Sequence, residues 1–411
     1  MRIGLFTDTY PPFINGVSTS VEMLKNALEK KKHEVYLVTV NDSSIKYDYD
    51  EENHILKIPS IPIGLYDYRL SRIYSLKMIN LIKSWNLDVI HSHTELGIGI
   101  CARLVAKQFN IPLIHTYHTM YKDYTHYVTH GHFDKSSKKI VEYLTKFYCD
   151  TTATELIVPT NKTYRLFKEN YKFEKNIHII PTGIEVDRFF KENVNKKEVD
   201  RLRKNLNLSK RDTVIIFVGR LAQEKNIEFL LNAEKKIINN HSNIKLLIVG
   251  DGPDKEKLEM FSRKLGIEKN VIFTGKVAWD DMPVYYQLAN FFATASKTET
   301  QGLTVIEAMA AGITPVCIHD EAFLTAITDN LNGFIFDNID EYVEIILKLE
   351  KNKQERAKIS GQARIQAEHF SSAQFADNVL VVYNKAIENR KKYKFGIFSK
   401  ITKKLKGEEW C

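Results

Sequence analysis

The sequence is poor in cysteine and contains no long apolar run. Its four cysteines, Cys101, Cys149, Cys317 and Cys411, show neither paired nor metal-type spacing in 411 residues. Such sparse thiols are typical of a reducing compartment. No stretch approaches the roughly 20 apolar residues that span a bilayer, and no signal-type segment opens the sequence. We therefore expect a cytoplasmic protein whose contact with the inner face of the cell membrane is peripheral.

Several motifs of cofactor and metal chemistry are also absent. The sequence has no G-x-G-x-x-G loop, which disfavours dinucleotide redox chemistry, and no D-x-D motif. No H-E-x-x-H pattern or nearby cysteine pair accompanies its histidine cluster. We therefore expect no metal and no cofactor, and no nucleic-acid-binding module is recognisable. The clustered histidines for which we expect a structural role are His91, His93, His126, His130 and His132.

The net charge of +8 is concentrated at one end of the chain. Residues 385–411 include nine lysines or arginines and three glutamates, which gives +6 and leaves +2 for the rest. The tail 391–406 mixes these cations with bulky apolar residues, a composition that suits an anionic lipid surface. A solvated or disordered end is the alternative. The segment 64–85 is also amphipathic, basic and aromatic, and a helix packed on the core explains it equally well.

Short apolar runs alternate with amphipathic stretches, such as 21–31 and 227–238, along the chain. Such alternation predicts parallel sheets covered by helices on both faces. Because the runs form two series of domain length, we expect an α/β protein with two Rossmann-like domains facing across a cleft. The predicted strands are 3–7, 34–40, 89–91, 113–116, 156–159 and 177–181, then 214–218, 245–249, 271–274, 291–295, 314–318 and 333–336.

The length also predicts two domains, because 411 residues exceed what one hydrophobic core usually serves. The charged segment 191–211 separates the two series of strands and is the expected hinge. We therefore place an N-terminal domain at 1–195 and a C-terminal domain at 196–370. Residues 371–411 are expected to form a final helix and the basic tail.

The most informative segment is 299–312, which follows the predicted strand 291–295. Ligands of open α/β sheets bind at the carboxyl edge of the strands. A glycine there lets the backbone turn into a helix, whose first N–H groups can bind a phosphate. The residues with these N–H groups are Gly302, Leu303 and Thr304.

Two carboxylates flank this predicted phosphate site. Glu299 precedes the helix and can accept hydrogen bonds from sugar hydroxyls, whereas Glu307 lies just over one turn into it and can reach the hydroxyls of a ribose. The pair suits a sugar–diphosphate–ribose ligand lying across the helix start. A solvated acidic loop followed by an ordinary amphipathic helix is the alternative.

The segment 299–312 resembles the Glu-x7-Glu signature of the large retaining glycosyltransferase family 4, whose members have the GT-B fold. The resemblance extends in order over almost the whole chain. It implies transfer of a sugar from a nucleotide sugar with retention of the anomeric configuration, by front-face attack assisted by the leaving phosphate. The other matching segments are 181–185, 219–226, 250–253 and 271–275.

The resemblance also implies roles for individual residues. Arg220 and Lys225 would hold the diphosphate, a sensible role because two fixed cations stabilise the developing charge of the leaving group. Residues Phe273 and Thr274 lie in the segment whose backbone contacts the nucleobase, and Gly16 would face the diphosphate. His118 would lie beside the reacting sugar. The residues expected to act in catalysis are His118, Arg220, Lys225 and Glu299.

The segments 10–20 and 115–127 resemble one branch of the family, the diacylglycerol glucosyltransferases. That branch transfers an α-glucosyl unit from UDP-glucose to the free hydroxyl of diacylglycerol. The expected partners are therefore UDP-glucose, diacylglycerol or another lipid acceptor, and an anionic membrane surface.

Three other functions stay open from the sequence. The chain could be a family 4 transferase for a wall polymer, a polysaccharide or another lipid, with a different hexose. It could be a sugar-nucleotide epimerase of GT-B fold, which needs no acceptor. It could also be a non-catalytic protein that binds a membrane or nucleic acid through its basic tail, although the presence of both glutamates, Arg220 and Lys225 argues against a degenerate scaffold.

Overall fold

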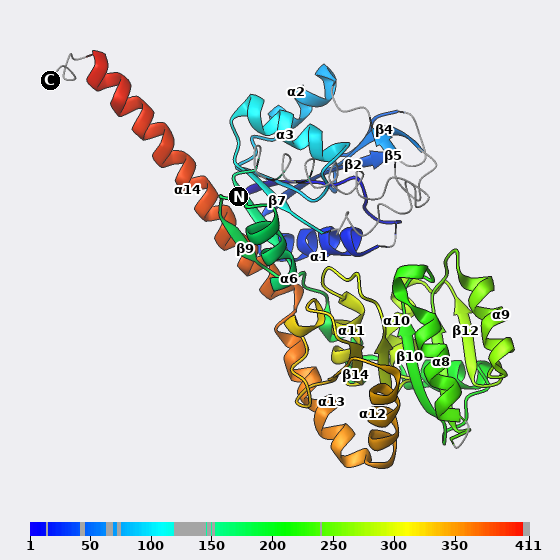
Figure 1. The fold of residues 1–411 in the computed structure, drawn as a ribbon. Coiled ribbons are helices and arrows are strands. Elements are labelled where there is room, and N and C mark those ends of the chain that lie inside the picture. Colours follow the sequence, from blue (N-terminus) through cyan, green and yellow to red (C-terminus); the bar gives the residue numbers. More distant parts are fainter. Residues whose placement is uncertain are drawn as a thin grey trace, which may run out of the picture. The chain divides into compact units, whose positions relative to one another are not determined.

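A computed structural model describes the chain as two compact units (Figure 1). Unit 1 comprises Met1–Pro159, Thr163–Gly183 and Ala373–Cys411, and unit 2 comprises Thr160–Lys162 and Ile184–Ser372. The described residues are 1–13, 15–41, 46–62, 69–71, 75–118, 145, 149, 153–238 and 241–405, without the side chains of 62, 69–71 and 391–405. Four predicted features lie wholly or partly outside them: the segment 64–74, the motif part 119–127, the histidines 126, 130 and 132, and the tail side chains.

Unit 1 is built on a mixed sheet of strand order β3-β4-β2-β1-β6-β7-β8-β9, with β5 paired to β4. The β3–β4 and β4–β5 pairs are antiparallel and the others are parallel. The central strands β6, β7 and β8 are buried on both faces, although they also include polar residues such as His91, His115 and Glu155. The strands are β1 (Arg2–Phe6), β2 (Glu34–Asn41), β3 (Asp48–Asp50), β4 (Ile55–Pro62), β5 (Arg69–Ser71), β6 (Val89–Ser92), β7 (Leu113–Thr116), β8 (Glu155–Val158) and β9 (Ile177–Ile179).

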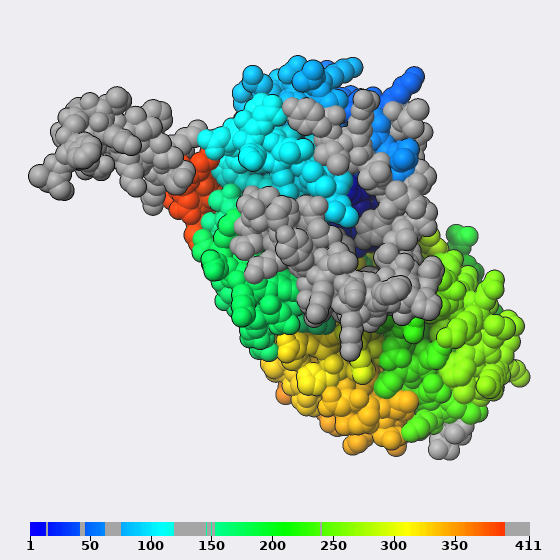
Figure 2. Space-filling view, turned by 45° about the horizontal axis from the view of Figure 1, so that its top comes forward, coloured from blue at the N-terminus to red at the C-terminus, as the bar shows by residue number. Residues whose placement is uncertain are grey.

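Helices cover both faces of this sheet. Apolar side chains of α1 (Gly16–Lys30) and α14 (Ser372–Leu405) pack on one face. Those of α2 (Leu76–Ser84) and α3 (Ile98–Phe109) pack on the other. The helix α6 (Asn161–Arg165) continues into a π-helical turn, η3 (Leu166–Asn170). Figures 1 and 2 both show α14 beside the segment that carries β8 and β9.

Unit 2 contains a parallel sheet of strand order β12-β11-β10-β13-β14-β15. Its strands are β10 (Thr213–Val218), β11 (Ile244–Val249), β12 (Val271–Gly275), β13 (Phe291–Thr294), β14 (Thr314–Ile318) and β15 (Phe334–Phe336). The helices packed around the sheet form one buried apolar core with it. They are α7 (Lys196–Asn205), α8 (Ile227–Ile238), α9 (Lys255–Leu265), α10 (Met282–Tyr286), α11 (Leu303–Ala310), α12 (Ile339–Lys351) and α13 (Lys353–Glu368).

All twelve predicted strands are confirmed to within two residues at either end. The prediction of two α/β units is also confirmed, with a largely parallel sheet in unit 1 and a parallel sheet in unit 2. The strands β3, β4 and β5 were not predicted. They form the margin of the unit 1 sheet, where polar residues interrupt the apolar pattern. Within the described residues, no helix is both long enough and apolar enough to cross a bilayer.

The expected hinge at 191–211 lies inside unit 2 instead. Val199 and Leu202 of its central helix α7, and Leu206 directly after the helix, pack against the core of that unit despite the high charge of the segment. The chain changes units between Gly183 and Ile184, before the predicted boundary at 195.

The final segment does not stand apart from the units as a third region. From Ala373 onwards it belongs to unit 1, where α14 contributes Phe375, Val379 and Tyr383 to the core. The backbone of α14 stays helical to Leu405, so the helix reaches well into the basic tail.

Substitution of a buried glutamate in α8 is expected to stabilise unit 2 in alkaline solution. Glu234 is 1% exposed, and its Oε1 has no hydrogen-bond partner among the described residues. Burial raises its pKa from 4.5 to about 8, partly opposed by Lys245. Because the folded state binds this proton more tightly than the unfolded state, the free energy of unfolding falls as the pH rises from 4.5 towards 8.

Glu234→Gln removes this dependence and should raise Tm by about 2–4 °C at pH 8.5, with little gain at pH 4.5. Thermal unfolding across this pH range is the measurement. Glu228→Gln on the same helix is the matched control, because Glu228 is half-exposed and pairs with Lys257. Equal shifts at both pH values would contradict the protonation argument.

Candidate active site

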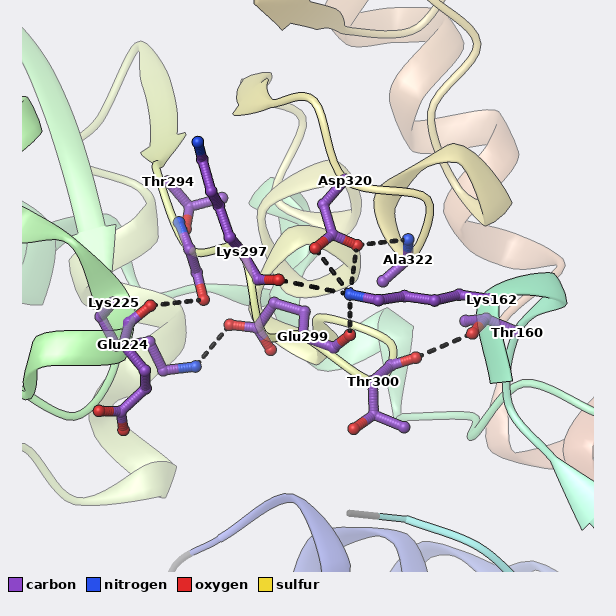
Figure 3. Close-up of polar contacts among 11 residues, drawn as sticks. Thr160, Lys162, Glu224, Lys225, Thr294, Lys297, Glu299, Thr300, Asp320 and Ala322 are labelled. Atoms are coloured by element: carbon purple, nitrogen blue, oxygen red, sulfur yellow. Dashed lines mark hydrogen bonds and ion pairs between the residues drawn. The ribbon is translucent and has the colours of Figure 1, made fainter. Parts of the chain in front are cut away.

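The carboxyl ends of β10 and β13 bring two predicted site residues together. These strands are parallel neighbours, so the loops that follow them leave the sheet at the same edge. Lys225 ends a 3-10 turn, η6 (Gln223–Lys225), in the first loop, and Glu299 lies in the second. The Lys225 ammonium donates to Glu299 Oε1 at 2.5 Å (Figure 3). The two side chains are 20% and 19% exposed, so solvent reaches only part of this ion pair.

The Glu299 carboxylate is held in its ionised form. Burial raises its pKa, but the charge of Lys225 and hydrogen bonds from Lys225 and Ser296 outweigh burial, with a further contribution from Lys162. The resulting pKa lies below the usual value of 4.5. An ionised carboxylate accepts hydrogen bonds at both oxygens, as binding to sugar hydroxyls requires.

The helix α11 begins at Leu303, four residues after Glu299. The N-cap of α11 is Gly302, whose φ of +82° favours glycine. A Cβ at this position would come within 2.7 Å of the Phe323 ring. Among the described residues no side chain caps the helix, so its partial positive charge is not neutralised at Leu303 and Thr304. Such a helix start can bind a phosphate.

The second predicted carboxylate is buried in α11 against α10. Glu307 is 6% exposed, and the Tyr286 hydroxyl donates to its Oε2 at 2.7 Å. Burial raises the pKa of Glu307 to about 7, opposed by the Tyr286 hydrogen bond and the charge of Arg188. Near neutral pH this side chain therefore titrates, whereas Glu299 does not.

The remaining predicted donor residues of unit 2 lie at the same sheet. Arg220 is exposed in the loop after β10, five residues before Lys225. Phe273 and Thr274 lie in β12, at the outer edge of the sheet and two strands away from β10, and both are partly buried. The structure thus joins Lys225 directly to Glu299 and places Glu307, Phe273 and Thr274 outside that contact.

In unit 1, the predicted His118 follows β7 and meets a second histidine. His93 Nδ1 and His118 Nε2 lie 3.0 Å apart, so one imidazole donates to the other. Burial lowers the pKa of His118 to about 3, which keeps it neutral. Within the described residues, no group of three or more metal-ligating side chains is arranged to hold a metal ion.

Two further predicted residues of unit 1 are accounted for by local structure. His91 bridges the Tyr383 hydroxyl at 2.7 Å and Thr116 Oγ1 at 2.6 Å, which fits the structural role expected of it. Gly16 is the first residue of α1 and is exposed, next to the N-cap Asn15, whose side chain accepts from two backbone N–H groups.

Comparison with known proteins identifies the chain's family. Residues 14–188 match the family described as Glycosyltransferase Family 4, and residues 198–366 match Glycosyl transferases group 1. The chain is 35% identical to an alpha-monoglucosyldiacylglycerol synthase of Streptococcus pneumoniae, over 82% of this chain and 75% of the relative. It is 33% identical to a protein of the same name from Acholeplasma laidlawii, over 95% and 99%.

The chain belongs to the family 4 glycosyltransferases.

The fold of this glycosyltransferase is GT-B. The crystal structure of the Anabaena protein Alr3699/HepE in complex with UDP and glucose superposes with a TM-score of 0.71 at 16% identity, covering 94% of this chain and all of the other. The two α/β units, whose sheets are wholly or largely parallel, agree with the fold class that the sequence predicted.

The structure adds residues to the glycosyltransferase site that sequence reasoning missed. Tyr286 contacts Glu307. Lys162 and Asp320 contact each other beside Glu299 (Figure 3). None of the three belongs to a recognised motif, and Lys162 precedes Asp320 by 158 residues.

Proposed function

We propose that the protein transfers an α-glucosyl unit from UDP-glucose to the free hydroxyl of diacylglycerol, with retention, at a membrane surface. The geometry that carries this proposal is the ion pair of Lys225 and Glu299 beside the start of α11. A cation and a helix start suit a diphosphate, and an ionised carboxylate next to them suits the attached sugar. The lipid acceptor is supported by the names of two relatives, which are 35% and 33% identical to this chain.

In the proposed reaction the acceptor hydroxyl oxygen forms a bond to the anomeric carbon. The bond from that carbon to the diphosphate oxygen breaks on the same face, and the hydroxyl proton passes to the departing oxygen. Arg220, Lys225 and the start of α11 would stabilise the charge that develops on UDP. Glu299 would hold the sugar hydroxyls, and neutral His118 would lie beside the sugar.

The test is an incubation of the purified protein with UDP-[14C]glucose and diacylglycerol in anionic mixed micelles, resolved by thin-layer chromatography of the organic phase. We expect a labelled monoglucosyl lipid that Arg220→Ala and Glu307→Ala no longer make. Glu228→Ala, which removes a surface carboxylate of unit 2, should leave the product unchanged.

The other outcomes of this incubation are informative. A labelled water-soluble product without labelled lipid would support transferase activity and reject the lipid acceptor. Consumption of another nucleotide sugar in place of UDP-glucose would reject the donor. A folded protein that consumes no nucleotide sugar with any acceptor would reject the proposed site.

Removal of the Tyr286 hydroxyl is expected to weaken the nucleotide part of the donor site. Tyr286→Phe deletes the hydrogen bond to Glu307 and raises the pKa of that carboxyl further above its usual range. Since Glu307 is proposed to bind the ribose, UDP and UDP-glucose should lose affinity alike, by about tenfold at pH 7. Calorimetric titration at pH 7 and 8.5 measures both ligands, and the loss should shrink at the higher pH. Tyr285→Phe in the same helix is the control.

A further inference from the structure

A three-residue segment outside the predicted motifs holds the loop that carries Glu299. Thr160–Lys162 belong to unit 2 by their contacts, although the sequence on both sides of them, Met1–Pro159 and Thr163–Gly183, belongs to unit 1. Thr160 Oγ1 donates to the carbonyl oxygen of Thr300 at 3.0 Å (Figure 3). The segment therefore contacts the residue that directly follows Glu299.

Lys162 makes the larger set of contacts with this loop. Its ammonium lies 2.7 Å from each carboxylate oxygen of Asp320 and donates to the Glu299 carbonyl oxygen at 3.1 Å. The carbonyl oxygen of Lys297 lies 3.5 Å away. The Lys162 and Asp320 side chains are 19% and 6% exposed. Figure 3 shows the Lys162 side chain extending to a point where Asp320 and both backbone carbonyls converge.

Asp320 is itself fixed in place. Its Oδ1 accepts a hydrogen bond from the backbone N–H of Ala322 at 2.8 Å, in the turn after β14. Strand β14 is the parallel neighbour of β13, so this turn and the Glu299 loop leave the sheet at the same edge. A lysine ammonium has three donors, which matches a carboxylate and two carbonyl oxygens on its different sides.

We infer that Lys162, assisted by Thr160, is a positioning residue that sets the backbone of residues 297–300 and thereby the direction of the Glu299 carboxylate. It acts at the peptide of Glu299, while Lys225 acts at the other end of the same residue, on its carboxylate. The inference rests on the proposed role of Glu299 in binding the donor sugar. It predicts that Lys162 governs recognition of the sugar and leaves recognition of the nucleotide to other residues.

The test compares UDP-glucose with UDP in the full-length Lys162→Met variant. Displacement of a positioned group by about 1 Å can cost about 100-fold in rate, so kcat/KM for UDP-glucose should fall roughly 30- to 100-fold. The inhibition constant of UDP should stay within about twofold, because UDP has no sugar for Glu299 to contact. If Lys162 had only a structural role, its substitution would impair the use of UDP-glucose and the binding of UDP to a similar extent.

Lys162→Met leaves the buried Asp320 carboxylate without its cation, which could destabilise the fold. A second variant therefore separates loss of positioning from misfolding. The double substitution Lys162→Met/Asp320→Asn removes both charges and should show the same loss for UDP-glucose. The milder Thr160→Val, which deletes one hydroxyl donor, should show a loss of about threefold.

A matched control and a rescue sharpen the test. Lys168 is a lysine of unit 1 that also donates to two backbone carbonyl oxygens, those of Phe173 and Lys175, so Lys168→Met should leave both constants unchanged. Treatment of Lys162→Cys with 2-bromoethylamine creates a lysine analogue and should restore most of the activity. The treated wild type controls for reaction at its own cysteines.

Amide hydrogen exchange tests the positioning without any substrate. Residues 297–300 should exchange faster in the double variant than in the wild type or Lys168→Met. Unchanged exchange, or equal losses for UDP and UDP-glucose, would overturn the inference. Failure of the wild type to use UDP-glucose, together with faster exchange in the variant, would instead overturn the proposed donor and retain the positioning role.

Discussion

Glu299→Ala is expected to lower kcat/KM for UDP-glucose by about 1,000-fold, since a charge-assisted contact made in the transition state is lost. Glu299 is the residue at which three features of the structure meet. Its carboxylate accepts from Lys225, its carbonyl oxygen accepts from Lys162, and α11 begins four residues later. Removal of the carboxylate also leaves the Lys225 ammonium without this partner in the part of the site that would receive the diphosphate.

The measurement is the initial rate of glycolipid formation, with thermal unfolding as a check of the fold. Because Glu299 is proposed to contact the sugar alone, binding of UDP should be retained or slightly strengthened as Lys225 is released. Glu228→Ala is the matched control, since it removes an exposed carboxylate of unit 2 that pairs with Lys257. A folded Glu299→Ala variant with kcat/KM within tenfold of the wild type would contradict the assignment.

Lys225→Met is expected to lower kcat about 100- to 1,000-fold and to move the acid limb of the pH–rate profile upward. The loss of rate follows from the missing stabilisation of the leaving diphosphate. The shift follows from Glu299, whose pKa burial raises and Lys225 lowers. Without the ammonium, the pKa of Glu299 rises, so the carboxylate becomes protonated, and activity is lost, at a higher pH than in the wild type.

The pH dependence of kcat/KM between pH 4.5 and 8.5 measures this effect. Lys257→Met, which removes an exposed lysine of the same unit, should change neither the rate nor the profile. An acid limb that stays in place while kcat falls would show that Lys225 acts on the diphosphate without controlling the ionisation of Glu299.

Much of the fold could be predicted from the sequence, because strands and helices are indicated by local sequence patterns. Parallel strands buried on both faces favour short apolar runs, and most of the predicted strands were recognisable as such runs. The segment from Glu299 to Glu307 was also readable, since a strand, a loop, a glycine and a helix follow one another within a short stretch. The sequence alone therefore determined the two α/β units, the family resemblance and the edge of the sheet at which the site lies.

Other features depend on packing between distant segments, and only the tertiary structure decided them. The charged segment 191–211 belongs to unit 2 because three apolar side chains, in α7 and directly after it, pack against the core of that unit. Glu307 titrates near neutrality because burial raises its pKa, a rise that the hydrogen bond from Tyr286 of α10 only partly opposes. Lys162 meets Asp320 and Glu299 although more than 130 residues separate it from either. A local sequence pattern cannot predict such contacts, because they join residues that are distant along the chain. These residues become neighbours only through the order in which the strands pair within a sheet.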